Sequence, residues 1–221
     1  MKLSYESPHA NVSAAACRNG NISSIEWNKT GAPKSVYGFQ YDALNRMTHA
    51  IYGEGPTATS NPGRYNETLT YNLNGDINTL QRWGKNGGTP TVPTFGQIDN
   101  LTYAYTSSGA ARLSSVTDGS NTSYGFATTS SNNHSYSYDA NGNLNGRTNT
   151  GYNTITYNHL NLPHTISGTG GTITNVFDAG GRKWQSTVGG VTTTYFGDIE
   201  YEGNAIKAIY HQDGRILNNS G

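Results

Sequence analysis

The stretch YSYDANGNL at residues 136–144 recurs along the chain, and its recurrence decides the fold. It consists of an aromatic anchor, an Asp or Asn, two or three small or polar residues that include Gly or Asn, and an apolar or basic position. Repetition of such a unit indicates a repeat architecture. Further copies are FQYDALNRM (39–47), LTYNLNGDI (69–77), ITYNHLNLP (155–163) and TNVFDAGGRK (174–183), with a looser copy YAYTSSGAARL (103–113) and a half unit GNISSIEW (20–27).

The spacing of the aromatic anchors gives the period of the repeat. Successive anchors are separated by 30, 34, 33, 19 and 20 residues, so the base period is about 20. The longer intervals contain segments rich in turn residues, at 53–67, 84–96 and 117–133, which we predict to be exposed loops. Residues 1–221 are therefore interpreted as one repeat array. The anchors are Tyr41, Tyr71, Tyr105, Tyr138, Tyr157 and Phe177.

Each unit has the pattern of a β-hairpin. Apolar residues alternate before the anchor, which predicts a strand with one covered face. Asn74-Gly75 and Asn141-Gly142 suit a type I′ turn, and a second strand follows the turn. No segment shows a convincing helical period with caps. The sequence therefore predicts an all-β fold in which antiparallel hairpins add side by side.

The alternating Asp and Asn of the DANGN segment also raise the alternative of a calcium loop. An EF-hand loop that begins at Asp139 would need Gly at its sixth position and Glu at its twelfth, where Leu144 and Thr150 stand. Other copies carry Asn72 or Asn158 in place of the acid. We therefore predict a turn in which this side chain caps backbone N–H groups, and no metal site.

Composition excludes several classes of function. Hydrophobic residues make up 33% and charged residues 13%, with a formal net charge of zero. This leaves no basic surface for nucleic acid or anionic lipid, and no apolar run approaches the length of a membrane span. The single cysteine, Cys17, allows no disulfide within the chain. We expect no nucleic-acid partner and no membrane insertion.

No constellation of residues indicates catalysis, a cofactor or a metal. No serine lies in a GxSxG motif, and GTGGT at 168–172 lacks the lysine and the strand-to-helix context of a phosphate loop. Asp198, Glu200 and Glu202 alternate along one predicted strand and are expected to be solvated. The six histidines lie at no metal-binding spacing and are expected at the surface: His9, His49, His134, His159, His164 and His211. Glu54, Glu67 and Asp118 complete the acids considered for a glycosidase pair, for which no signal of a raised pKa is found.

The tryptophans leave two interpretations open. Trp27, Trp83 and Trp184 all follow strand-like runs. Aromatic rings on a sheet can pack against each other and line its face, or they can stack on sugars. We favour packing and keep carbohydrate binding as the alternative.

The YDALNRM, YDANGNL and FDAGGRK units resemble the YD repeats of RHS-repeat proteins, over nearly the whole chain. Residues 157–216 are similar to the segment that precedes the RHS-associated core in Bacteroidetes-type members. The resemblance assigns structural roles, and no catalytic, cofactor or metal role, to the repeat positions. These are Tyr41, Asp42, Tyr71, Asn72, Tyr105, Tyr138, Asp139, Gly142, Tyr157, Asn158, Phe177, Asp178 and Gly181.

The resemblance implies a long, curved or spiralling antiparallel sheet that forms part of a β-shell. Family members are large bacterial secreted or cell-surface proteins, including polymorphic toxins whose shell encloses an effector. No DPxG or DHLGN-like core motif is present, so we expect a fragment of a larger protein whose signal lies elsewhere. The expected role is a non-catalytic scaffold whose partners are further repeats and the core, with an encapsulated effector or glycans as additional partners. The alternative is an adhesion module that binds carbohydrate or protein through its Tyr/Trp face.

Overall fold

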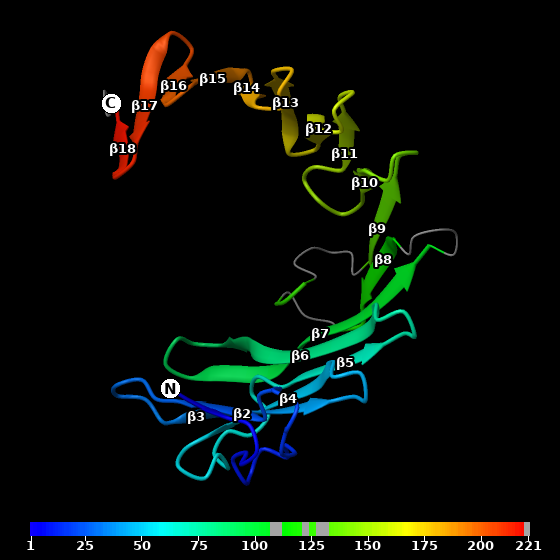
Figure 1. The fold of residues 1–221 in the computed structure, drawn as a ribbon, viewed down its shortest axis with the longest axis vertical. Helices are drawn as coiled ribbons and strands as arrows, with labels where there is room; N and C mark the ends of the chain where they lie inside the picture. The colour runs from blue at the N-terminus through cyan, green and yellow to red at the C-terminus, as the bar shows by residue number, and fades with distance from the viewer. Residues whose placement is uncertain (107–111, 121–123, 127–132, 219–221) are drawn as a thin grey trace. The chain divides into compact units, whose positions relative to one another are not determined.

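The computed structural model describes residues 1–106, 112–120, 124–126 and 133–218, and its regular structure in these ranges is β-strand throughout (Figure 1). The chain divides into two compact units, Met1–Asn133 and His134–Gly221. None of the anchors lies in a helix, and the all-β prediction is confirmed. No helix in the described residues is long and apolar enough to cross a membrane.

In the first unit, each strand pairs antiparallel with the next strand along the chain. Its strands are β1 (Lys2–Ser4), β2 (Ser24–Trp27), β3 (Ser35–Tyr41), β4 (Met47–Glu54), β5 (Glu67–Tyr71), β6 (Ile77–Gly88), β7 (Pro93–Tyr105) and β8 (Leu113–Asp118).

The second unit has the same sequential antiparallel pairing. Its strands are β9 (Asn133–Tyr138), β10 (Leu144–Arg147), β11 (Thr154–Tyr157), β12 (Pro163–Gly168), β13 (Gly171–Phe177), β14 (Lys183–Val188), β15 (Val191–Phe196), β16 (Ile199–Glu202), β17 (Ala205–His211) and β18 (Gly214–Leu217).

The predicted loop at 84–96 is wrong for most of its length. Residues up to Gly88 extend β6, and β7 begins at Pro93, so only 89–92 form the turn. The glycines that suggested a loop pair across the ladder, with Gly84 opposite Gly96. Glycine weakens a strand but does not forbid it, and here the partner strand supplies the backbone hydrogen bonds.

The other two predicted insertions fall mainly between strands. Residues 55–66 connect β4 to β5, and Ser60 in this connection forms an isolated bridge with Glu54, the last residue of β4. The 117–133 segment follows the end of β8 and leads to β9, and much of it lies outside the described residues.

A small core lies where loops cover one face of the first unit. Val12, Val36 and Ala58 form one buried cluster, each no more than 3% exposed. Gly38 allows this contact, because a Cβ there would lie 2.4 Å from the Val12 Cγ2. The N-terminal segment therefore packs on the face of β3 opposite to Tyr37, Phe39 and Tyr41.

Candidate functional site

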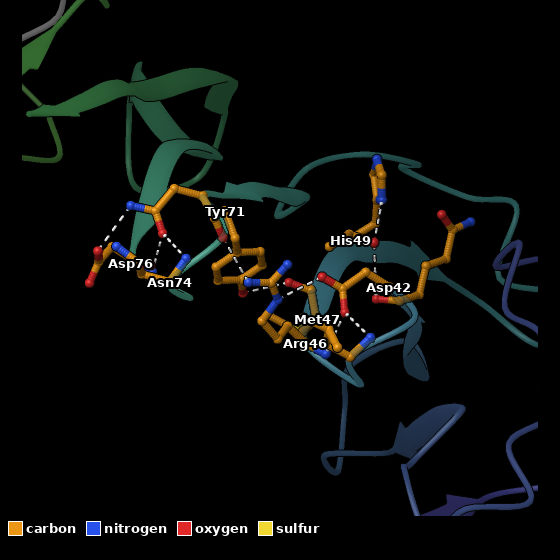
Figure 2. A network of polar contacts seen from close by, with 11 residues as sticks. Asp42, Arg46, Met47, His49, Tyr71, Asn74 and Asp76 are labelled. Carbon is orange, nitrogen blue, oxygen red and sulfur yellow. Dashed lines mark hydrogen bonds and ion pairs between the residues drawn. The ribbon is translucent and has the colours of Figure 1, made fainter.

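The turn between β3 and β4 is built around the side chain of Asp42 (Figure 2). Its Oδ1 accepts the backbone N–H groups of Leu44 at 2.9 Å and Arg46 at 3.0 Å. The N–H of Asn45 bonds to the Asp42 carbonyl, and the N–H of Asp42 bonds to the Arg46 carbonyl. Asn45 has a φ of 63°, in the left-handed region. This is a three-residue loop in which a type I turn is followed by a left-handed residue.

The same geometry recurs in four other copies, and the looser copy at 103–113 differs, because the N–H of Arg112 bonds to Thr106 Oγ1 six residues before it. In these four, the Asp or Asn after the anchor accepts the backbone N–H four residues ahead, and the third loop residue is left-handed. The acceptors are Asn72, Asp139, Asn158 and Asp178, and their distances to that N–H are 2.9, 2.8, 3.0 and 2.9 Å. The left-handed residues are Gly75, Gly142, Asn161 and Gly181.

The type I′ prediction for these turns is wrong. A type I′ turn needs positive φ at both central residues. Only Gly75 and Gly142 have positive φ, and Asn74 and Asn141 do not. The Asp or Asn carboxylate or amide oxygen is the physical reason, because its two bonds to N–H groups ahead favour the type I conformation.

A β-bulge follows every described turn of this kind. The anchor pairs with the residue six positions later, as Tyr41 does with Met47, and the ladder then shifts by one residue. The same shift adjoins Tyr71, Tyr157 and Phe177. A bulge adds local twist to the hairpin. Because the bulge follows the turn at the same position each time, these hairpins have the same pairing of strand residues next to the turn.

The anchor hydroxyls connect each hairpin to the one before it. The Tyr71 hydroxyl donates to the carbonyl of Met47 at 2.7 Å, and Met47 is the residue paired with the preceding anchor (Figure 2). Tyr105 donates to Ile77 at 2.9 Å, and Tyr157 donates to Leu144 at 2.8 Å. Each acceptor lies six residues after its own anchor, so the contact is periodic. We call this contact the anchor latch.

The half unit at residues 20–27 carries the first acceptor of the series. The Tyr41 hydroxyl donates at 2.8 Å to the carbonyl of Ile22, which lies two residues before β2. Ile22 therefore takes the place that Met47 takes for the next anchor.

The Phe177 unit has no anchor hydroxyl and uses a different donor. The equivalent acceptor is the carbonyl of Pro163, which pairs with Tyr157. The side-chain amide of Asn175 donates to this carbonyl at 3.1 Å, and Asn175 is buried. Asn175 lies two residues before Phe177 on the same face of β13. It therefore supplies the hydrogen bond that phenylalanine cannot.

Arg46 joins the first turn to the second one (Figure 2). Its Nε donates to Asp42 Oδ2 at 2.7 Å, and its Nη1 donates to the Asn72 carbonyl at 3.1 Å. The guanidinium also lies over the Tyr71 ring, 4.6 Å from the centroid. The hydrogen bond from the Arg46 backbone N–H is the main cause that holds the pKa of Asp42 below its ordinary value, and the Arg46 side chain adds to it. Burial raises the pKa of Tyr71.

Aromatic rings pack across one face of the first unit. Tyr37 stacks on Trp27 and Phe39 and meets Tyr52 edge-on, and Tyr52 in turn meets Tyr65 at 5.0 Å between centroids. Burial is the larger cause, and the negative charge of the nearby Glu67 the smaller one, that raises the pKa of Tyr37 to about 12. Most of these rings contact one another, which is the packing arrangement favoured from the sequence.

The acids considered for catalysis are distributed among separate contacts. Glu54 is buried and accepts hydrogen bonds from Tyr52 and Asn61. Glu200 and Glu202 are not simply solvated as expected, because Lys207 pairs with both at 3.3 and 2.9 Å. Asp198 lies in the turn between β15 and β16 rather than on the strand.

The remaining candidates also lie apart. No group of three or more metal-binding side chains is found within the described ranges. His134 is buried, contrary to the expectation of a surface position, and the Thr148 carbonyl lies 3.2 Å from its Nδ1, so this ring nitrogen has a partner inside the sheet. Cys17 lies beside a groove of about 680 Å³ between residues 13–21 and the β3–β4 turn.

Sequence reasoning found the capping residues but missed the latch. A preference for tyrosine over phenylalanine at five of the six anchors was the available signal, since a strand alone does not require a hydroxyl. Asn175 carried no such signal, because its role follows only from the acceptor it reaches.

The comparisons with known proteins found similarity only to solved structures. The chain matches no protein-family model, and no curated protein matches it. Among solved structures, it is similar to the Tc holotoxin pore of Photorhabdus luminescens, at 11% sequence identity and a TM-score of 0.38. The likeness covers 91% of this chain and 13% of that chain.

Removing one latch should destabilise the first unit measurably. Tyr71→Phe leaves the Met47 carbonyl without its donor, so we expect the free energy of unfolding to fall by about 1 kcal/mol. Urea denaturation followed by circular dichroism measures this change. Tyr65→Phe is the matched control, because in the described part of the chain the Tyr65 hydroxyl has no hydrogen-bond partner. Equal stability of the wild type and Tyr71→Phe would contradict the role of the latch.

The capping carboxylates should make stability depend on acid pH. The pKa of Asp42, Asp139 and Asp178 is lowered by hydrogen bonds from the turn, so the folded state binds their protons less tightly than the unfolded chain. Their contribution is present above the unfolded pKa, about 4, and is lost as pH falls through the folded pKa.

Asp42→Asn keeps the Oδ1 acceptor but removes the charge, as Asn72 and Asn158 do naturally. We expect a shallower loss of stability between neutral and acid pH than in the wild type. Asp213→Asn, at a side chain that is 82% exposed, is the control. An unchanged pH profile in Asp42→Asn would show that the turn carboxylate is not coupled to folding.

Proposed function

We propose that this chain is a non-catalytic YD-repeat segment of a large bacterial secreted or cell-surface RHS-type protein, where it contributes to a β-shell scaffold. The observation that carries the proposal is the anchor latch, which recurs with the capped turn in successive hairpins. The latch joins a side chain of one hairpin to the backbone of the hairpin before it and involves no reactive group. A repeated contact of this kind holds successive hairpins together in one sheet. In this proposal, the shell to which the chain contributes encloses an effector.

The parent protein provides the direct test. We expect the full-length product, studied by electron cryo-microscopy, to contain further hairpins with the same capped turn and to pair one of them with β18. We also expect each added anchor to reach the carbonyl six residues after the preceding anchor. A full-length protein in which no further hairpins pair with the strands of this chain would contradict the scaffold proposal.

A separate observation favours carbohydrate binding as a second function. A pocket of about 390 Å³ lies between residues 62–66 and the β6–β7 hairpin, and Trp83 and Phe95 line it. Trp83 and Phe95 share one face of the hairpin, because Trp83 is paired with Gln97, two residues from Phe95. The Arg64 guanidinium lies 4.3 Å from the Phe95 centroid.

Asn66 Oδ1 in this pocket accepts the backbone N–H of Tyr52, and the side-chain groups considered next are hydrogen-bond donors. Among the described residues, neither the Trp83 indole N–H nor the Asn66 side-chain N–H groups have a protein acceptor. An aromatic ring beside free donors suits a pyranose, whose C–H face packs on the ring while its hydroxyls accept. The proposed ligand is therefore an oligosaccharide, bound at this pocket rather than along the packed rings of β3 and β4.

Three tryptophan variants test the pocket on a glycan array. Trp83→Ala should weaken binding at least about tenfold, and Trp83→Phe, which keeps a ring but loses the donor, by about 2- to 10-fold. Trp184→Ala is the control in the other unit and should bind as the wild type does. Undiminished binding by Trp83→Ala would exclude this pocket. Release of free sugar in the same incubations, abolished by Glu200→Gln, would contradict a non-catalytic protein.

A further inference from the structure

The chain contains five Asn-Gly pairs, and the structure places them in different surroundings. Asparagine is thermolabile, and glycine after it leaves the backbone nitrogen unhindered for attack on the side-chain amide. That attack needs a nitrogen free of hydrogen bonds and a backbone that can bend toward the side chain. The pairs are Asn19-Gly20, Asn74-Gly75, Asn86-Gly87, Asn141-Gly142 and Asn145-Gly146.

Two of the pairs lie in capped turns, where the nitrogen of the glycine is occupied. The Gly75 N–H donates to the Asn72 carbonyl at 3.1 Å, and the Gly142 N–H donates to the Asp139 carbonyl at 3.0 Å. Attack by either nitrogen requires this bond to break, and the Asn or Asp cap holds the turn closed around it. The folded state therefore protects both pairs.

Two further pairs lie in paired strands. Gly87 is opposite Thr94 in the β6–β7 ladder, and Gly146 is opposite Ser137 in the β9–β10 ladder. The neighbouring strand holds the backbone extended, so it cannot bend toward a side chain without local opening. The Asn145 side chain is also engaged, because its Oδ1 accepts the Ser137 hydroxyl at 2.8 Å.

Asn19-Gly20 differs from these four, because it lies in the connection between β1 and β2 with both residues exposed. In the described part of the chain, the Gly20 N–H has no hydrogen-bond acceptor. Gly20 has a φ of 91°, and no other segment comes within 4 Å of the position that a Cβ would take. The Asn19 Oδ1 accepts the N–H of Asn21 at 3.1 Å, which folds the Asn19 side chain over the Gly20 peptide.

We propose that Asn19 is a site of spontaneous deamidation in the folded protein, and that the reaction loosens the N-terminal segment from the β3–β4 turn. The Gly20 nitrogen bonds to the Asn19 Cγ, and the side-chain NH2 group leaves as ammonia with the proton of that nitrogen. The product is a five-membered succinimide. Water, the only co-reactant, then opens the ring at either carbonyl and gives aspartate or isoaspartate.

The lost amide is a contact between two parts of the first unit. The Asn19 side-chain amide donates to Asn45 Oδ1, and Asn45 is the left-handed residue of the β3–β4 turn. Asn141 donates to Asn161 at 3.0 Å in the same way. A carboxylate at neutral pH cannot donate this bond, so deamidation of Asn19 leaves Asn45 Oδ1 with the bond from Asn21 at 3.3 Å.

Incubation of the whole chain at mildly alkaline pH, followed by mass spectrometry of its tryptic peptides, tests the site. We expect Asn19 to deamidate at least about fivefold faster than Asn141, because Gly142 must first lose a hydrogen bond. In guanidinium chloride this protection is absent, and we expect similar rates at all five pairs. Equal rates at Asn19 and Asn141 in the folded chain, or a preference for Asn19 that persists in the denaturant, would overturn the proposal.

Asn19→Asp reproduces one product of the reaction and tests its effect on the fold. We expect the urea midpoint of unfolding to fall, because the donor to Asn45 is lost. Asn28→Asp is the matched control, since Asn28 is exposed and its side chain makes no hydrogen bond within the described residues. The same midpoint in both variants would contradict the loosening of the N-terminal segment.

Discussion

The hydrogen bond from an anchor tyrosine to a carbonyl of the preceding hairpin is the contact on which the repeat depends. Ladder bonds join neighbouring strands but do not by themselves prevent a slip of one residue, which would turn every side chain to the wrong face. The latch fixes that register, because the hydroxyl of Tyr71 reaches one carbonyl, that of Met47. Where the anchor is Phe177, the amide of Asn175 makes the equivalent bond.

The latch matters because the chain has little hydrophobic core. Only 33% of its residues are hydrophobic, and the buried cluster of Val12, Val36 and Ala58 is small. Stability therefore relies on backbone ladders, on half-buried rings and on side chains that bind the backbone of turns. The capped turn and the latch act together, since Arg46 contacts both the Asp42 carboxylate and the Tyr71 ring.

Regular and irregular parts of the molecule support different proposals. The anchors and capped turns recur and hold no reactive arrangement, which suits a scaffold. The pocket at Trp83 forms instead where an irregular connection, residues 62–66, packs on an extended hairpin. The proposed carbohydrate site therefore lies where the repeat is interrupted.

Sequence alone determined the strand and turn order, the anchors and the capping role of the residue after each anchor. These properties are local, because alternation and turn residues act through the backbone of a few neighbours. The type I′ turns and the loop at 84–96 were predicted wrongly, since glycine content does not reveal which φ a capped turn needs or whether a partner strand is present. Tertiary structure alone decided the latch, the role of Asn175 and the burial of Glu54 and His134. Their partners are mostly main-chain carbonyls or side chains brought together by strand pairing, and a main-chain acceptor is present at every residue, so it leaves no mark in the sequence.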